Sequence, residues 1–452
     1  MHHTLIKNGM VLSVDPDVGD FLSGDVLIEG DRIKSVGQNL AAPNAEIVDA
    51  RGMIVLPGLI NAHFHSWATA LRGMGSDWAG WDFFRTVHGN LATCYTPKDS
   101  YLGTLLGALN QLNSGTTTFF EWCHNNKTPE HTNASIDALF DAGLRAVFGH
   151  GTVKPKPKEG EPHFSEIPHP MGEIKRLRSS RLSDDRALVT LAMCILGPDY
   201  ATREVTLEDF RMARELDILS SAHIWGRDDR RVKEGYHLIA REGLLGPKHN
   251  VVHGNYLDDA ELKVIVDSGA SVTSTPTVEL QSGHGEPLPR RVLAMGGRPS
   301  LGADLEINVA GDMFHVMRYT LQTVRLFNNR EKAASRMPIM ELNHFSRQAL
   351  EWATLNNAKA LGLEDRIGSL TPGKQADIIM LNTGDLNLFP VNNPIQTVVF
   401  QAYPANVDTV WVAGRKVKAN GHLLIYPENR LSEMKQELWE SNRRILKEGG
   451  LL

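Results

Sequence analysis

Cysteine is scarce in this chain, and the signatures of several protein classes are missing. The three cysteines among 452 residues, Cys94, Cys123 and Cys194, are too few for a disulfide framework. We therefore expect reduced thiols and a cytoplasmic protein. The first residues also lack the charged, apolar and small-residue order of a signal peptide. No apolar run reaches the roughly 18–20 residues that span a bilayer, which argues against a membrane protein.

Charge of one sign is not concentrated either. The chain has 47 Lys and Arg residues against 53 Asp and Glu residues, a formal net charge of −6, and no basic stripe that would follow a phosphate backbone. We expect no nucleic-acid partner and no membrane partner. The G-x-G-x-x-G turn and the P-loop are absent as well, which argues against an open doubly wound sheet that binds nucleotides.

The apolar pattern divides the chain into three parts. Short alternating segments predict a small β-sandwich domain built from residues 1–56 together with 373–428. Between them, residues 57–372 alternate eight apolar strand candidates, the first of them spanning 54–65, with longer helical stretches. This pattern predicts an α/β fold, a (β/α)₈ TIM barrel whose active site lies at the C-terminal ends of the strands. A C-terminal helix is expected over 429–452.

One long connection inside the predicted barrel has a different composition. Residues 154–170 read KPKPKEGEPHFSEIPHP, which is rich in proline and charge. Such a composition is typical of an exposed loop or lid. We place it between the third and fourth strands.

Histidine and aspartate fall repeatedly at the ends of the predicted strands. His63 and His65 end the first strand, His223 the fifth, His253 the sixth and Asp304 the eighth. Because parallel strands of a barrel end at one rim, these side chains should converge there. Imidazoles with a carboxylate suit Zn²⁺ or Fe²⁺, whereas Mg²⁺ and Ca²⁺ favour more oxygen ligands. The sequence therefore predicts a metal site.

These residues stand in longer motifs: PGLINAHFH followed by LRG, SGTTT, HGNYLDDAEL, SLGADLEINVAGDMF and ALEWATLNNAKALGLEDRIGSLTPGKQADIIML. Through them the chain resembles, over essentially its whole length, the amidohydrolase superfamily in its cytosine-deaminase-like and chlorohydrolase-like branch. The resemblance implies that His63, His65, His223 and Asp304 bind one divalent metal ion, zinc first and iron second. It also implies that His253 contacts the metal-bound water or the metal, and that the protein is a homo-oligomer.

Other branches of this superfamily hold two metals bridged by a carbamylated lysine on the fourth strand. The fourth strand candidate here, ALVTLAMCILGP, contains no lysine. We therefore expect one metal ion per chain.

The expected chemistry depends on the charge of the metal. A bound divalent cation lowers the pKa of its water from 15.7 to about 7. Asp304 can take the proton of that water and pass it to the leaving group, and His253 can orient the nucleophile and stabilise the oxyanion. We expect cleavage of a C–N bond, by deamination or amide hydrolysis, in a small cyclic or heteroaromatic substrate. Two alternatives stay open: a dechlorinase or dealkylaminase of an electron-poor ring, and a catalytically inactive barrel that acts as a binding protein.

One position departs from the family pattern. Deaminases of this branch carry a Glu three residues after the strand-five histidine, where it transfers a proton to the substrate ring, and Gly226 stands there in this chain. A general acid or base contributes about 10²–10⁴-fold to the rate. We expect Glu279 and His284, just beyond the seventh strand, to face the pocket and contact the substrate. Trp67 and Trp225 would supply flat surfaces for a ring to stack on.

Overall fold

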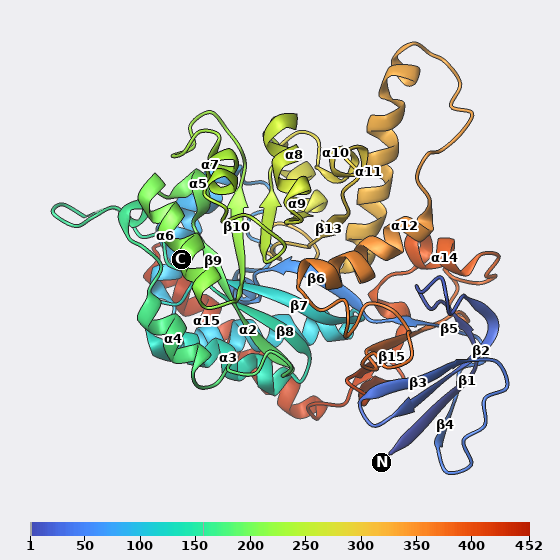
Figure 1. Cartoon of the computed structure of the whole chain (residues 1–452). Helices are drawn as coiled ribbons and strands as arrows, with labels where there is room; N and C mark the ends of the chain where they lie inside the picture. Colours follow the sequence, from blue (N-terminus) through green and yellow to red (C-terminus); the bar gives the residue numbers. More distant parts are fainter. Residues whose placement is uncertain (1, 157) are drawn as a thin grey trace.

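The computed structural model describes residues 2–156 and 158–452. In these residues two β-sheets lie side by side, with helices around the larger one (Figure 1). The larger sheet has eight parallel strands, and the smaller, mixed sheet is made from both ends of the chain. The predicted α/β fold, a TIM barrel with a small β domain from both chain ends, is confirmed.

The barrel strands follow one another in sequence order around the sheet. Nearly all of their residues are buried, as expected for parallel strands covered on both faces, which explains their continuous apolar runs. The strands are β6 (Leu59–Phe64), β7 (Thr116–Cys123), β8 (Arg145–His150), β9 (Val189–Ile195), β10 (Leu219–Ile224), β11 (His249–His253), β12 (Ser271–Ser274) and β13 (Pro299–Leu301).

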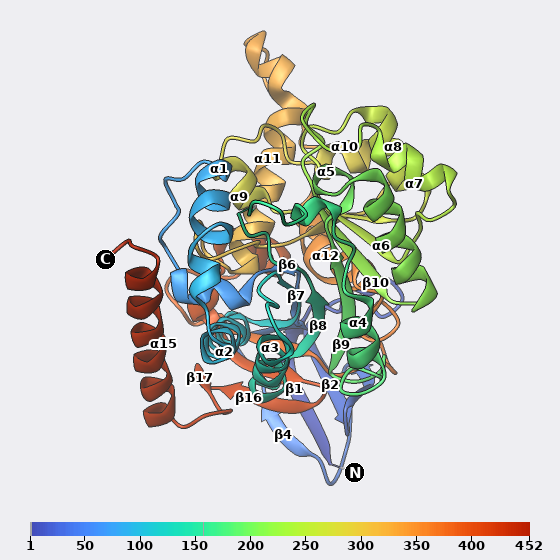
Figure 2. The same cartoon turned by 90° about the vertical axis from the view of Figure 1, so that its left-hand side faces the viewer.

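Helices connect these strands on the outside of the barrel (Figures 1 and 2). Several begin with a side-chain cap: the Asp258 carboxylate, for example, accepts from the Glu261 N–H at 2.8 Å and satisfies a free donor of the first turn. The main connecting helices are α2 (Pro97–Asn113), α3 (Pro129–Ala142), α4 (Met171–Arg178), α6 (Arg203–Glu215), α7 (Gly235–Arg241), α8 (Asp259–Asp267), α10 (Pro289–Ala294) and α11 (Met313–Ala334).

The first and last barrel strands meet through backbone hydrogen bonds at their C-terminal ends. The His65 N–H donates to the Asp304 carbonyl at 2.9 Å, and the Asp304 N–H donates to the His63 carbonyl at 3.0 Å. Deeper in the seam, the buried Asn357 side-chain amide donates to the Ile60 carbonyl on β6 and to the Leu301 carbonyl on β13. These bonds bring β6 and β13 together, so residues about 240 positions apart in sequence become neighbours.

The small sheet buries one apolar face, which includes Ile6, Val26, Ile28, Ile378 and Trp411. Its strands run in the order β17-β16-β15-β14-β5-β1-β2-β3, with β4 beside β1. Their bounds are β1 (His3–Val11), β2 (Phe21–Glu29), β3 (Arg32–Gly37), β4 (Glu46–Asp49), β5 (Met53–Pro57), β14 (Ile378–Asn382), β15 (Val407–Val412), β16 (Arg415–Ala419) and β17 (His422–Leu423).

The chain crosses from the small sheet to the barrel at Gly58. The expected single strand over 54–65 is divided there: β5 pairs with β1 and β14, and β6 pairs with β7. A Cβ on Gly58 would lie 2.1 Å from Thr117 Oγ1, so only glycine permits this close passage. Beside the crossing, the Arg145 guanidinium donates to the Asp377 carboxylate at 2.9 and 3.2 Å, and both residues are buried. This ion pair ties β8 to the start of β14.

Two long helices, α15 (Glu428–Glu448) and α11, lie at the edges of the molecule. Helix α15 packs beside α2, with the Asn442 amide donating to the Ala70 carbonyl at 2.7 Å (Figure 2). Helix α11 and the loop after it reach away from the barrel (Figure 1). None of the helices in the described residues is both long and apolar enough to cross a membrane.

Candidate metal centre

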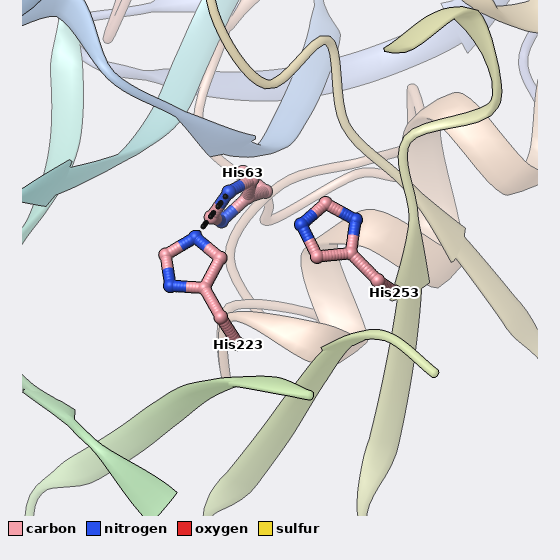
Figure 3. Close-up of side chains that lie close together, drawn as sticks. All are labelled: His63, His223 and His253. Carbon is pink, nitrogen blue, oxygen red and sulfur yellow. Dashed lines mark hydrogen bonds between the residues drawn. The ribbon is translucent and has the colours of Figure 1, made fainter. Parts of the chain in front are cut away.

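The strand-ending histidines meet at one point of the barrel rim. Figure 3 shows the rings of His63, His223 and His253 turned toward one another from three different strands. His65 and Asp304 join the same group, as two overlapping sets of possible metal ligands demonstrate. The five residues singled out by sequence are therefore brought together.

The distances within this group suit a four-ligand metal ion. His223 Nε2 lies 3.2 Å from His63 Nε2 and 3.3 Å from His65 Nε2. Asp304 Oδ1 lies 3.5 Å from His63 Nε2 and 3.2 Å from His65 Nε2. Zinc bonds of about 2.0–2.1 Å in a tetrahedron separate the ligand atoms by roughly 3.4 Å. The donor atoms therefore already stand at the spacing that such an ion requires.

The protonation states also suit a cation. Burial lowers the pKa of His63 to about 3 and holds the pKa of His223 well below its usual value, so both imidazoles are neutral at pH 7. Burial opposes the charge of Asp304, but hydrogen bonds from His63 and His65 outweigh it and hold the pKa of this carboxyl well below its usual value. Neutral imidazoles and an ionised carboxylate are the forms that bind metal ions.

One ligand ring is also fixed from behind. His65 Nδ1 lies 2.6 Å from the carbonyl oxygen of Trp122, which can only accept. Nδ1 of this ring therefore carries a proton, and Nε2 is the ring nitrogen that faces the group.

The backbone is strained at two of these residues. His253 has a φ of 68° and Asp304 a φ of 65°, both in the left-handed region that costs a non-glycine residue about 1–3 kcal/mol. Strain of this kind is retained where the surrounding structure fixes it, often at functional sites. Here the strained backbone directs the side chains of His253 and Asp304 toward the other histidines of the group.

Glu279 lies behind His253, on helix α9 (Pro276–Gln281). Its Oε1 is 3.3 Å from His253 Nδ1 and accepts from the Thr275 N–H at 2.8 Å. Thr275 Oγ1 is 3.1 Å from the same His253 nitrogen. Glu279 is completely buried, so its contact is with His253.

The remaining predicted pocket residues lie at different depths. The Trp225 ring stacks on the His253 ring with centroids 4.3 Å apart, and the His284 ring lies 4.0 Å from Trp225 on the partly exposed side. Trp67 is buried and packs edge-on against Tyr95. Trp225 and His284 therefore border the group on its open side, and Trp67 belongs to the wall beneath.

Gly226 is closely surrounded. Its φ is +81°, and a Cβ would lie 2.7 Å from the backbone nitrogen of Leu257. The N–H groups of Trp225 and Gly226 donate to the partly buried Asp199 carboxylate at 2.7 and 3.0 Å, which holds the turn in this shape. The local backbone therefore has no room for the glutamate that related deaminases carry here.

Sequence reasoning missed several polar residues beside the group. His124 stacks on His65 with centroids 4.6 Å apart, and His88 lies 4.5 Å beyond His124. Lys154, expected on an exposed loop, is only 5% exposed. His124 could have been found, because it directly follows the end of β7 as the other histidines end their strands. Lys154 gave no such signal within its polar segment.

Fold and site together define a metal-dependent hydrolase built on a TIM barrel. The sequence profile of the Amidohydrolase family matches residues 54–417, so the chain belongs to this family and is a hydrolase of carbon–nitrogen bonds.

Relatives match nearly the whole chain. The 5-methylthioadenosine/S-adenosylhomocysteine deaminase of Pyrococcus furiosus is 28% identical over 435 residues, covering 94% of this chain and 98% of the relative. The 5'-deoxyadenosine deaminase of Methanothermobacter thermautotrophicus is 29% identical over 446 residues, covering 95% and 98%.

Solved structures share the fold. An adenosine deaminase from Xanthomonas campestris with bound zinc has a TM-score of 0.82 at 22% identity, covering 97% of this chain and 98% of the other. The atrazine chlorohydrolase from Arthrobacter aurescens complexed with zinc has a TM-score of 0.83 at 20% identity, covering 96% and 100%.

We predict that Gly226→Ala destabilises the protein. The new Cβ meets backbone at 2.7 Å in a left-handed conformation, so the free energy of unfolding should fall by at least about 1 kcal/mol. The matched control is Gly246→Ala, whose Cβ meets nothing within 4 Å, and it should change this free energy by less than about 1 kcal/mol. Urea unfolding measures both. Equal losses in the two variants would contradict the steric account.

Proposed function

We propose that the chain binds one zinc ion through His63, His65, His223 and Asp304 and hydrolytically removes an amino group from a heteroaromatic ring. The meeting of three imidazole nitrogens and one carboxylate oxygen at 3.2–3.5 Å carries this proposal. The relatives from Pyrococcus furiosus and Methanothermobacter thermautotrophicus are named as deaminases of 5-methylthioadenosine and 5'-deoxyadenosine. Their names support a purine nucleoside, or a ring like it, as the substrate.

The residues around the ion would have different roles in the reaction. When bound, a divalent cation supplies a Lewis acid that makes water nucleophilic near neutral pH, and Fe²⁺ would suit the same donors. Asp304 can accept the proton of the attacking water, because it is ionised and buried at the centre of the group. His253 Nε2, 3.9 Å from Asp304 Oδ2, can accept a hydrogen bond from that water and orient it for attack.

Glu279 is then a positioning residue. A buried carboxylate beside His253 Nδ1 fixes which nitrogen carries the proton and keeps the ring at its angle. The Trp225 ring lies parallel to the His253 ring within 5° and covers one face of it. Trp225 and His284 also supply the flat surface on which a substrate ring can stack.

A second reaction is favoured by Gly226. Attack on an aromatic amidine carbon needs a proton on the ring nitrogen, and the residue that supplies it in related deaminases is absent here. Displacement of chloride or an alkylamine from an electron-poor ring needs this acid less. Release of ammonia from 5'-deoxyadenosine, measured against release of chloride from atrazine, distinguishes the two reactions.

The chain also has an apolar arm suited to self-association. The end of α11 and the following loop carry exposed apolar side chains, among them Leu326 at 63%, Met340 at 80% and Phe345 at 63% exposed. Apolar side chains grouped on a projecting segment are typical of a surface that another chain covers. We propose a homo-oligomer, and we expect light scattering to give a mass at least twice the 50.0 kDa of one chain. A monomeric mass would contradict this.

Metal content provides the first test of the zinc site. Protein purified without chelators should contain about one zinc per chain by mass spectrometry, because the four donors fit one tetrahedral ion. The double variant His63→Ala, His223→Ala should lose it. The control His2→Ala, His422→Ala removes two exposed imidazoles and should keep it. Folded wild-type protein that neither contains nor takes up metal would overturn the proposal.

Removing the charge behind His253 tests the role of Glu279. Glu279→Gln should lower kcat by about 10–100-fold with little change in KM, because the substitution disturbs His253 and not the substrate surface. Zinc content should stay at the wild-type level. The control is Glu286→Gln on the following loop, whose carboxylate pairs with Arg290. An unchanged kcat and pH–rate profile in Glu279→Gln would show that this carboxylate does not act through His253.

A further inference from the structure

A cavity of about 100 Å³ lies beside the metal centre, on the far side of His124. Its wall includes the strand-ending segment that follows β7 and the segment that follows β8. The lining residues are His88, Ala92, Thr93, His124, Asn125, Lys127, Val153, Lys154 and Pro155. Among the residues that the structure describes, the wall holds two lysines, two histidines and no carboxylate.

Several polar groups of this wall have no partner among the described residues. Lys154 is 5% exposed, and its amine lies 5.5 Å from the centroid of the Trp122 ring and makes no hydrogen bond or ion pair within residues 2–156 and 158–452. Asn125 is 1% exposed, and neither its side-chain oxygen nor its nitrogen is hydrogen-bonded in that part of the chain. His124 Nδ1 is equally unpartnered there. Leaving such a group without a partner costs about 1–3 kcal/mol, so a wall with three of them is suited to a polar ligand.

The charge of the wall decides which ligand fits. Burial lowers the pKa of Lys154 to about 7, because the interior disfavours an uncompensated ammonium. A second metal ion held by His124 would face this amine and would be repelled by its charged form. An anion would instead supply the acceptor that Lys154 and the Asn125 amide nitrogen lack. The other lysine of the wall, Lys127, already donates to the Thr93 and Tyr95 carbonyls.

The cavity also lies close to the proposed metal site. His124 stacks on His65 and on His223, two of the proposed ligands, with centroids 4.6 and 5.3 Å apart. The opposite side of His124 contacts His88 of the cavity wall at 4.5 Å. The cavity is therefore separated from the proposed metal ligands by one imidazole, that of His124.

We propose that this cavity is an anion subsite, in which Lys154 and Asn125 bind a carboxylate, in first place a carboxylate carried by the substrate. The identification of the substrate's carboxylate rests on the proposed hydrolase function. The anion subsite itself rests only on the unpartnered groups and the cavity.

The first experiment tests the subsite without any turnover. The zinc-loaded protein is titrated with acetate and with acetamide, which has the same shape and no charge, and the thermal midpoint is recorded. Acetate should raise the midpoint and acetamide should not, because a ligand that binds the folded state stabilises it. Lys154→Met keeps the apolar stem and should abolish the acetate effect. Lys156→Met, an exposed lysine on the same segment, should retain it.

A second arm identifies the source of the anion. Dissociation constants are measured by calorimetry for 5'-deoxyadenosine and for the same nucleoside with a carboxylate at its 5' carbon. If the substrate carries the anion, the carboxylate compound should bind the wild type about ten- to a hundredfold more tightly, as a charged hydrogen bond provides. Lys154→Met should lose that preference. Equal binding of both compounds, with the acetate effect present, identifies a free carboxylate as the ligand.

The outcomes separate this proposal from the proposed function. An acetate effect that persists in Lys154→Met places the anion on the metal and overturns the subsite, as does the absence of any acetate effect in the wild type. Failure of the hydrolase function would show as missing ammonia and chloride release, and it would leave the acetate result unchanged.

Discussion

The closure of the barrel between β6 and β13 is the contact on which the rest of the site depends. Two backbone hydrogen bonds join His63 and His65 to Asp304, the residue that ends the last strand. The same bonds that complete the sheet therefore set the carboxylate 3.2–3.5 Å from two imidazoles. The positive φ of Asp304 is tolerated because backbone partners on β6 hold it from both sides. Closure of the barrel therefore brings three of the candidate metal ligands together.

Burial then determines what this assembled group can do. The imidazoles of His63 and His223 stay neutral because burial removes them from water, and Asp304 stays ionised because it accepts hydrogen bonds from His63 and His65. The buried charge of Asp304 is poorly compensated by neutral imidazoles alone. A divalent cation supplies that compensation, so its binding also contributes to the free energy of folding. Burial therefore determines both the protonation of these residues and their suitability for a metal ion.

Strand periodicity made part of the site predictable from sequence, whereas features that depend on contacts between distant segments were missed. Residues that end predicted strands, such as His223 and His253, were located because every parallel strand of a barrel ends at the same rim. The division of the first strand at Gly58 depends on the approach of Thr117, which lies on another strand. Lys154 has the neighbours of an exposed residue in sequence, and only packing against Trp122 and the histidines buries it. Glu279 was expected at the substrate, whereas the structure sets it against His253, because helix α9 begins immediately after β12 and turns the carboxylate inward.

The replacement of a catalytic glutamate by glycine has a structural explanation in the turn around Gly226. Asp199 occupies the two N–H groups of that turn, and Leu257 fills the space where a side chain would begin. Placing a glutamate here would therefore require changes in three segments of the chain, those of Asp199, Gly226 and Leu257. His253 and the Glu279 carboxylate behind it lie next to this turn, because the Trp225 ring stacks on the His253 ring. Under the proposed function, the absence of this acid favours a substrate whose ring is already activated.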